Sequence, residues 1–216
     1  MGLLSQFSSK AEMHRRETIK RFDEFLESYI GKMETVEKPA LDELSITLVS
    51  RGPESAVAAA LLRRADKLIE IGCEIRAIFV NIDSACEFSD FIEMTGMCNG
   101  QHCLSDSIRW AKNPSLLDAH EQLVLGASHC WSGDAMRRSS DTRFALDLFE
   151  CADCTTIDLG RMAFDGLWSA SAAVPKSRFR NVVAPSRSPA PVVAQMEGVR
   201  EGLQDISFSA AVVTRH

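Results

Sequence analysis

The chain has 216 residues, a net charge of −6, 45% hydrophobic residues and 25% charged residues. This length suits one medium domain with appendages, and the composition is that of an ordinary globular protein. No run approaches the ~18 apolar residues of a membrane span, and the first residues lack the pattern of a signal peptide. We therefore expect a cytoplasmic protein whose seven cysteines are thiols.

The first forty residues predict a helical arm. Apolar side chains recur at helical spacing from Phe22 to Met33, charged residues fill the opposite face, and Pro39 ends the pattern. Such a helix is expected to pack on its own domain or on a second subunit.

A strand, a helix and a second strand follow in close succession. Leu44–Val49 and Glu74–Val80 have the composition of strands, and Ser55–Gly72 predicts an amphipathic helix capped by its final glycine. Short connections between them predict a right-handed βαβ unit in a sheet that is at least partly parallel. The turn Ser50–Gly52 lacks the glycine pattern of a dinucleotide site, and we predict no cofactor.

The rest of the chain predicts further strands and a closing helix. Residues 84–105 are typical of a loop or short helix, Ser107–Ala111 and Gln122–Leu125 of strands, Phe144–Phe149 of a strand or helix, and Asp158–Ser169 of a helix. We therefore predict an α/β fold: a mixed, mostly parallel sheet with helices on both faces.

The composition changes near Val174, after which proline, serine, arginine and alanine dominate. Such a segment is typical of a mobile linker. The predicted organisation is a helical arm at 1–40, an α/β domain at 41–173, and a mobile linker and tail at 174–216.

The segment Leu116–Glu150 holds the candidate site. His120 precedes the apolar run Leu123–Leu125, Gly126 follows as a turn, and a cluster of Ser, Asp and Arg comes next. Many α/β folds build a site from a polar residue at a buried strand and a polar turn. We take His120 as the candidate catalytic residue, and as candidate ligand-binding residues Gln122, Ser132, Gly133, Asp134, Arg137 and Arg138.

Residues of roughly 44–170 resemble one half of the phospholipase D-like superfamily. Leu61–Val80 is similar to the family's helix and second strand, and His120-Glu121-Gln122 stands where the family has its HxK motif. Trp131–Asp134 lies near the position of the family's GS turn, and Phe164–Trp168 resembles the helix that follows. The resemblance implies that His120 would attack phosphorus while a second HxK motif, from another half or subunit, protonates the leaving group.

The motif departs from the family at the residues that would assist the histidine. Gln122 stands where lysine would supply a cation, and Ala127 is near the expected position of an acid that orients the imidazole. Arg137 or Arg138 would be the substitutes for the lysine, and Asp134 or Asp141 for the acid. We therefore predict an eroded site, with little or no catalysis.

The predicted function is a phospholipase D-like domain, non-catalytic or weakly active, that binds a phosphate-containing small molecule or a phosphodiester. A single half-motif implies a homodimer. The net charge does not favour nucleic acid, although Arg137, Arg138 and Arg143 could form a local basic patch. The alternative within the same class is an active phosphodiesterase with substituted catalytic partners.

A zinc-stabilised interaction protein is the alternative from another class. Knuckle-like pairs at Cys98/Cys103 and Cys151/Cys154, with His102 and His129-Cys130 between them, offer enough ligands for tetrahedral zinc. The wide first pair is atypical, so we predict dispersed thiols and no metal. Cys130 beside His129 is also a candidate nucleophile, though no hydrolase signature surrounds it.

Overall fold

The structure is a computed structural model that describes residues 2–83, 85–100, 104–112, 120–133, 147–151, 154–175 and 177. The helices are α1 Gly2–Thr35, α2 Leu41–Leu44, α3 Ala56–Arg63, α4 Ala65–Ile71, α5 Ala85–Cys98, α6 Leu104–Ser107 and α7 Cys154–Ala170. The strands are β1 Ser45–Ser50, β2 Glu74–Phe79, β3 Ile108–Trp110, β4 Glu121–Leu125, β5 His129–Gly133, β6 Asp147–Cys151 and β7 Ala172–Ala173. Nearly all of the predicted tail at 174–216 lies outside the described residues, so its mobility and its boundary stay predictions.

The seven strands of the described chain form one mixed sheet in the order β6-β5-β4-β1-β2-β3-β7. The α/β class and the mixed sheet are confirmed, but the expectation of mostly parallel strands is wrong. Among the described strands, only the β1–β2 and β2–β3 pairings are parallel, and the other four are antiparallel. A tight turn joins β4 to β5 through Gly126, whose φ is +54°, and strands joined in this way must be antiparallel.

The central βαβ unit is confirmed, with one difference in its helix. The predicted helix at 55–72 is divided into α3 and α4 at Arg64, whose φ of −104° and ψ of 8° interrupt the regular backbone. Ser55 caps α3, because its hydroxyl accepts a hydrogen bond from the Ala58 amide. Gly72 closes α4 in the left-handed conformation, with φ of +81°, as predicted.

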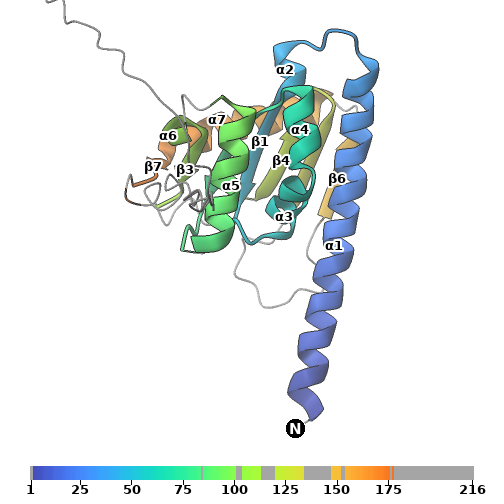
Figure 1. The fold of residues 1–216 in the computed structure, drawn as a ribbon, viewed down its shortest axis with the longest axis vertical. Helices are drawn as coiled ribbons and strands as arrows, with labels where there is room; N and C mark the ends of the chain where they lie inside the picture. Colours follow the sequence, from blue (N-terminus) through green and yellow to red (C-terminus); the bar gives the residue numbers. More distant parts are fainter. Residues whose placement is uncertain are drawn as a thin grey trace, which may run out of the picture. The chain divides into compact units, whose positions relative to one another are not determined.

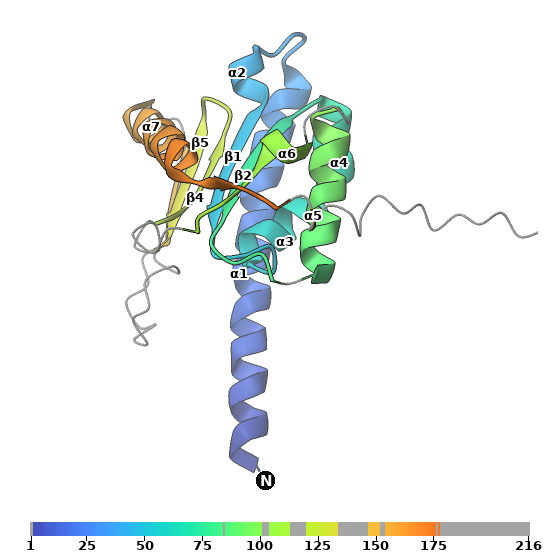
Figure 2. The same ribbon diagram turned by 90° about the vertical axis from the view of Figure 1, so that its left-hand side faces the viewer.

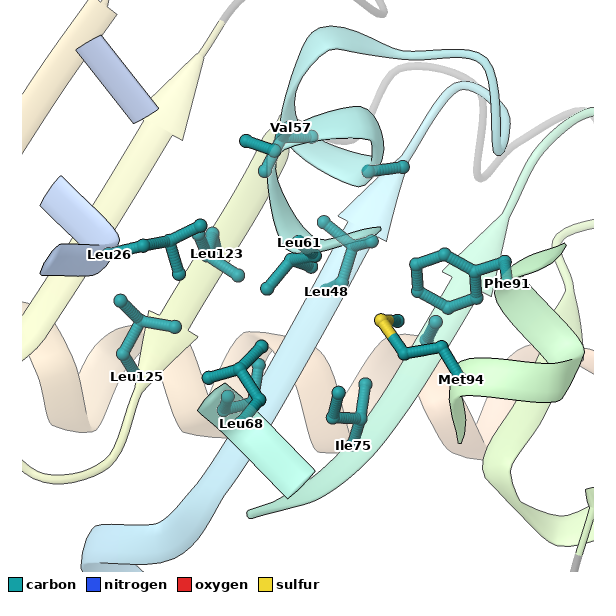
Figure 3. Close-up of a cluster of buried hydrophobic side chains, with 14 of the residues drawn as sticks. Leu26, Leu48, Val57, Leu61, Leu68, Ile75, Phe91, Met94, Leu123 and Leu125 are labelled. Atoms are coloured by element: carbon teal, nitrogen blue, oxygen red, sulfur yellow. The ribbon is translucent and has the colours of Figure 1, made fainter. Parts of the chain in front are cut away.

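Helices cover both faces of the sheet, as predicted (Figures 1 and 2). On one face, Leu48 and Leu123 of the central strands meet Leu26 of α1 and Leu61 of α3, and all four side chains are fully buried (Figure 3). On the other face, α7 packs on β1, β4 and β5. The alternation of side chains along each strand therefore divides the candidate residues between two different layers.

Helix α1 packs its carboxyl-terminal half on the sheet through a row of buried side chains: Ile19, Phe22, Phe25, Leu26, Tyr29, Ile30 and Met33. Residues 12–17 are instead exposed on every side of the helix. The predicted arm is thus part of the core in its second half, and it ends at Thr35 rather than at Pro39.

Several segments differ from the sequence expectation. Residues 84–105 were expected to form a loop or short helix, but α5 runs over fourteen residues and buries Phe88, Phe91 and Ile92. The ambiguous segment ending at Phe149 contributes strand β6. The closing helix begins at Cys154, earlier than predicted.

Two glycines give a matched test of the backbone. An L-residue at the positive φ of Gly72 is strained, although no atom lies within 4 Å of an added Cβ. We expect Gly72→Ala to lower the free energy of unfolding by about 1–2 kcal/mol. Gly31 lies inside α1 with the same open space, so Gly31→Ala should raise it by about 1 kcal/mol. Urea unfolding measures both, and equal changes in the two variants would contradict a special backbone requirement at Gly72.

Candidate functional site at the His120 edge

The candidate residues gather where β1 ends and β4 begins. The two strands are antiparallel, with Val49 opposite Gln122, so the carboxyl end of β1 adjoins the start of β4. His120 directly precedes β4 and is exposed. We call this region, formed by Ser50–Ser55, His120–Gln122 and Ser132–Gly133, the His120 edge.

Glu121 is the residue of this edge that the sequence analysis missed. Its side chain is 4% exposed, and its Oε1 accepts hydrogen bonds from the Ser50 hydroxyl at 2.9 Å and from the Arg51 amide at 2.8 Å. The Ser50 hydroxyl also lies 2.7 Å from Oγ of Ser55, the residue that caps α3. The carboxylate thus lies beside the start of a helix, where the helix dipole and free amides favour negative charge. On this face of the sheet, the protein's own carboxylate occupies the position that favours an anion.

Gln122 points to the opposite face and is enclosed beneath α7. A Cβ added to Gly160 would lie 2.3 Å from Gln122 Nε2 and 3.4 Å from Cys130 Sγ, so the absent side chain of Gly160 leaves room for the amide. Gln122 is 9% exposed and hydrogen-bonds the Cys130 thiol. Its amide is therefore engaged inside the protein rather than presented beside His120.

The structure places Ser132 and Gly133 next to these residues. Ser132 lies opposite Gln122 in the β4–β5 ladder and is half-buried, and Gly133 lies opposite Glu121. An added Cβ on Gly133 would lie 2.4 Å from the Trp131 ring, so only glycine fits there without a shift of that ring. Asp134, Arg137 and Arg138 lie outside the described residues, as do Asp141 and Arg143.

Ala127 does not lie near His120. It belongs to the turn between β4 and β5 and is exposed, whereas His120 precedes the other end of β4. An acid at position 127 could not orient the imidazole, so the expectation that compared this position with the family's acid is wrong. The five residues of β4 separate the two positions.

His129 and Cys130 do not form a catalytic pair, because consecutive residues of β5 point to opposite faces. Cys130 packs with Val124 and Ile157 under α7, and burial raises the pKa of its thiol. His129 packs against Phe25 and Tyr29 of α1. The two residues are therefore neighbours in sequence only, as the lack of a hydrolase signature around them indicates.

His129 makes the stability of the α1–sheet contact depend on pH. Its Nε2 lies 3.2 Å from the Ser28 hydroxyl and its Nδ1 lies 2.8 Å from the Ser128 hydroxyl. Burial, and then the charge of Lys32, lower the pKa of His129 in the folded protein below the ordinary value of about 6.5. As the pH falls below about 6.5, the unfolded chain binds a proton before the folded chain does, so the free energy of unfolding falls.

We expect His129→Gln to reduce the loss of stability on acidification from about pH 7.5 to about pH 5. The variant has no titrating imidazole at this position. His14→Gln is the matched control, because His14 is exposed on α1. Urea unfolding at several pH values measures the effect, and an unchanged slope in His129→Gln would contradict the assignment.

The zinc alternative rests on cysteine and histidine residues that the structure describes in part. No group of three or more His, Cys, Asp or Glu side chains suited to a metal occurs among the described residues. Cys98 is half-buried, and burial raises the pKa of its thiol to about 12. His102 and Cys103, and the side chains of Cys151 and Cys154, lie outside what the structure describes, so a site built on them stays untested.

Comparison with known proteins gives no family. No protein-family model matches the chain, and no curated protein is similar to it in sequence. Among solved structures, the chain is similar to TrmBL2, an archaeal chromatin protein whose structure shows a novel mode of DNA binding, at 11% identity and a TM-score of 0.39. The match covers 79% of this chain and 68% of that protein, and a likeness this low indicates neither a shared fold nor a shared function. No helix in the described part of the chain is long and apolar enough to cross a membrane.

Proposed function

We propose that the chain is a phospholipase D-like domain that has lost efficient catalysis and binds a phosphate-containing ligand at the His120 edge. The burial and the contacts of the two residues after His120 support the loss of catalysis. The Glu121 carboxyl group is buried and accepts two hydrogen bonds, and Gln122 offers a neutral amide that is enclosed beneath α7.

Phosphodiester cleavage requires the opposite electrostatics. The phosphoryl oxygens gain negative charge in the transition state, and cations or aligned donors must stabilise that charge. Removing one preorganised donor typically costs about 10²–10³ in rate. With a neutral, enclosed amide at position 122 in place of the cation, the transition state lacks this donor, and we expect little or no cleavage.

The ligand would contact the side chains of the edge that remain accessible. His120 is exposed and Ser132 is half-buried, and both can donate a hydrogen bond to a phosphate oxygen. Arg137 and Arg138, a few residues further along the chain, would add the positive charge that binding a phosphate needs.

We expect His120→Ala to weaken binding of inorganic phosphate and of dimethyl phosphate by about tenfold, the cost of one hydrogen bond to a charged group. Titration of the full chain, followed by amide chemical shifts at constant ionic strength, measures the affinity. His14→Ala removes a histidine that is exposed on α1 and should change nothing. Equal affinities in wild type and His120→Ala would contradict the proposed site.

We propose a homodimer, because the family's mechanism uses two HxK motifs and this chain supplies one histidine. Residues 12–17 of α1 are exposed and are available to a second copy. Deleting residues 1–16 should weaken the dimer while leaving Phe22 and the rest of the α1 core row in place. Light scattering measures the mass, and a monomer before any deletion would contradict the dimer.

A further inference from the structure

A cavity lies on the α7 face, at the end of the sheet away from His120. It has a volume of about 170 Å³ and is lined by residues that include Thr47, Arg76, Val124, Arg161, Phe164 and Asp165. Thr47 is opposite Val124 in the β1–β4 ladder, and Arg76 lies near the start of β2. We call this cavity the α7 pocket.

Thr47 brings an unused hydroxyl to the α7 pocket. The residue is 6% exposed, and its Oγ1 has no hydrogen-bond partner among the residues that the structure describes. Its neighbours Ile46 and Leu48 point into the apolar core on the other face. A buried hydroxyl without a partner costs about 1–3 kcal/mol, which valine of nearly the same shape would avoid. A ligand that enters the pocket would supply the missing hydrogen-bond partner.

Two guanidinium groups reach the same cavity. Arg76 lies over the Phe164 ring at 5.1 Å and the Trp168 ring at 5.4 Å, and its distance to the Asp165 carboxylate is 3.5 Å. Arg161 donates a hydrogen bond of 2.9 Å to the main-chain oxygen of Asp42 and has no ion pair within the described ranges. Aromatic rings and a main-chain oxygen thus position both groups while leaving several N–H donors free.

Asp42 and Asp165 also line the pocket, and the guanidinium donors that Asp165 and the Asp42 main chain leave over match an oxyanion. A carboxylate or phosphate accepts two parallel hydrogen bonds from a guanidinium, and a third oxygen lone pair can accept from a threonine hydroxyl. Val124 and the Phe164 ring add an apolar wall for a short carbon chain. The volume is below the about 300 Å³ at which pockets for drug-sized ligands begin, so the ligand is small.

We propose that the α7 pocket binds a small oxyanion, a short organic carboxylate or a phosphate, through Arg161, Arg76 and Thr47. This site is separate from the His120 edge and does not depend on the function proposed above.

Titration of the full chain with succinate and with inorganic phosphate tests this site. Amide chemical shifts report binding, and sodium chloride keeps the ionic strength constant. We expect at least one of the two anions to bring the chemical-shift changes to saturation. Which anion does so shows whether the pocket takes a carboxylate or a phosphate. Arg161→Gln should weaken it by about tenfold, because a charge-assisted hydrogen bond is lost. Thr47→Val should weaken it severalfold while leaving the free energy of unfolding unchanged or higher.

Two controls distinguish binding in the α7 pocket from a general effect of charge and from binding at the His120 edge. Arg16→Gln removes a charge from an arginine whose side chain is 78% exposed on α1, so it should leave the affinity unchanged. His120→Ala should also leave binding in the α7 pocket unchanged. The proposal is overturned if neither anion saturates, or if Arg161→Gln and Thr47→Val bind as tightly as wild type. Binding that is lost only in His120→Ala would place the anion at the His120 edge and would equally overturn it.

Discussion

Replacing Phe22 by alanine is expected to lower the free energy of unfolding by about 3–5 kcal/mol, the typical cost of deleting a buried aromatic ring. Phe22 is 1% exposed, and its ring centre lies 4.7 Å from that of Trp131 and 5.3 Å from that of Phe149. These three rings join α1 to β5 and β6. The alanine would leave a cavity that the surrounding strands cannot close.

Urea unfolding monitored by circular dichroism measures this loss. Met13→Ala is the matched control on the same helix, because Met13 is 63% exposed and should change stability by no more than about 0.5 kcal/mol. If Phe22→Ala were as stable as Met13→Ala, α1 would not be packed on the sheet, and the assignment of its second half to the core would be wrong.

Replacing Glu121 by leucine is expected to lower the free energy of unfolding by about 2 kcal/mol, because a buried hydroxyl and a partly buried amide lose their acceptor, and a donor without an acceptor costs about 1–3 kcal/mol. The donors are the Ser50 hydroxyl and the Arg51 amide. The Ser50 hydroxyl can turn to Ser55 Oγ, whereas the Arg51 amide would be left without its carboxylate.

Glu121→Gln separates the hydrogen bonds from the charge. The amide keeps an oxygen that can accept from Arg51, so we expect this variant to lose about 1 kcal/mol, clearly less than Glu121→Leu. Thermal unfolding of the two variants at the same pH makes the comparison. Losses of equal size would show that the charge, rather than the accepted hydrogen bonds, accounts for the contribution of Glu121.

Local patterns in the sequence predicted much of the fold. The βαβ unit was predictable because Leu44–Val49 and Glu74–Val80 have strand composition and Gly72 is a typical helix cap. The direction of β4 was not predictable, since a strand buried along its whole length has the same composition in either direction. The interruption at Arg64 was not predictable, because the apolar residues keep their helical spacing across it.

The candidate site was predictable only in part. His120 and its place at the start of a buried strand followed from the sequence, and so did the position of Gln122 in that strand. The family motif specifies positions 120 and 122 and assigns no role to Glu121. Strand alternation nevertheless places Glu121 on the same face as the buried Leu123 and Leu125. Pairing between strands that are distant in the chain, which brings Ser50 to Glu121, requires the fold.

The loss of catalysis at His120 is tested most directly by rapid acid quench of the full chain mixed with a bis-aryl phosphodiester. We expect aryl alcohol release at the background rate, no burst, no phosphohistidine, and the same result for His120→Ala. Gln122→Lys alone should not restore activity, because the side chain at position 122 lies beneath α7. A burst that depends on His120, with a covalent phosphohistidine trapped by the quench, would contradict the loss of catalysis and identify the chain as an active phosphodiesterase with substituted partners.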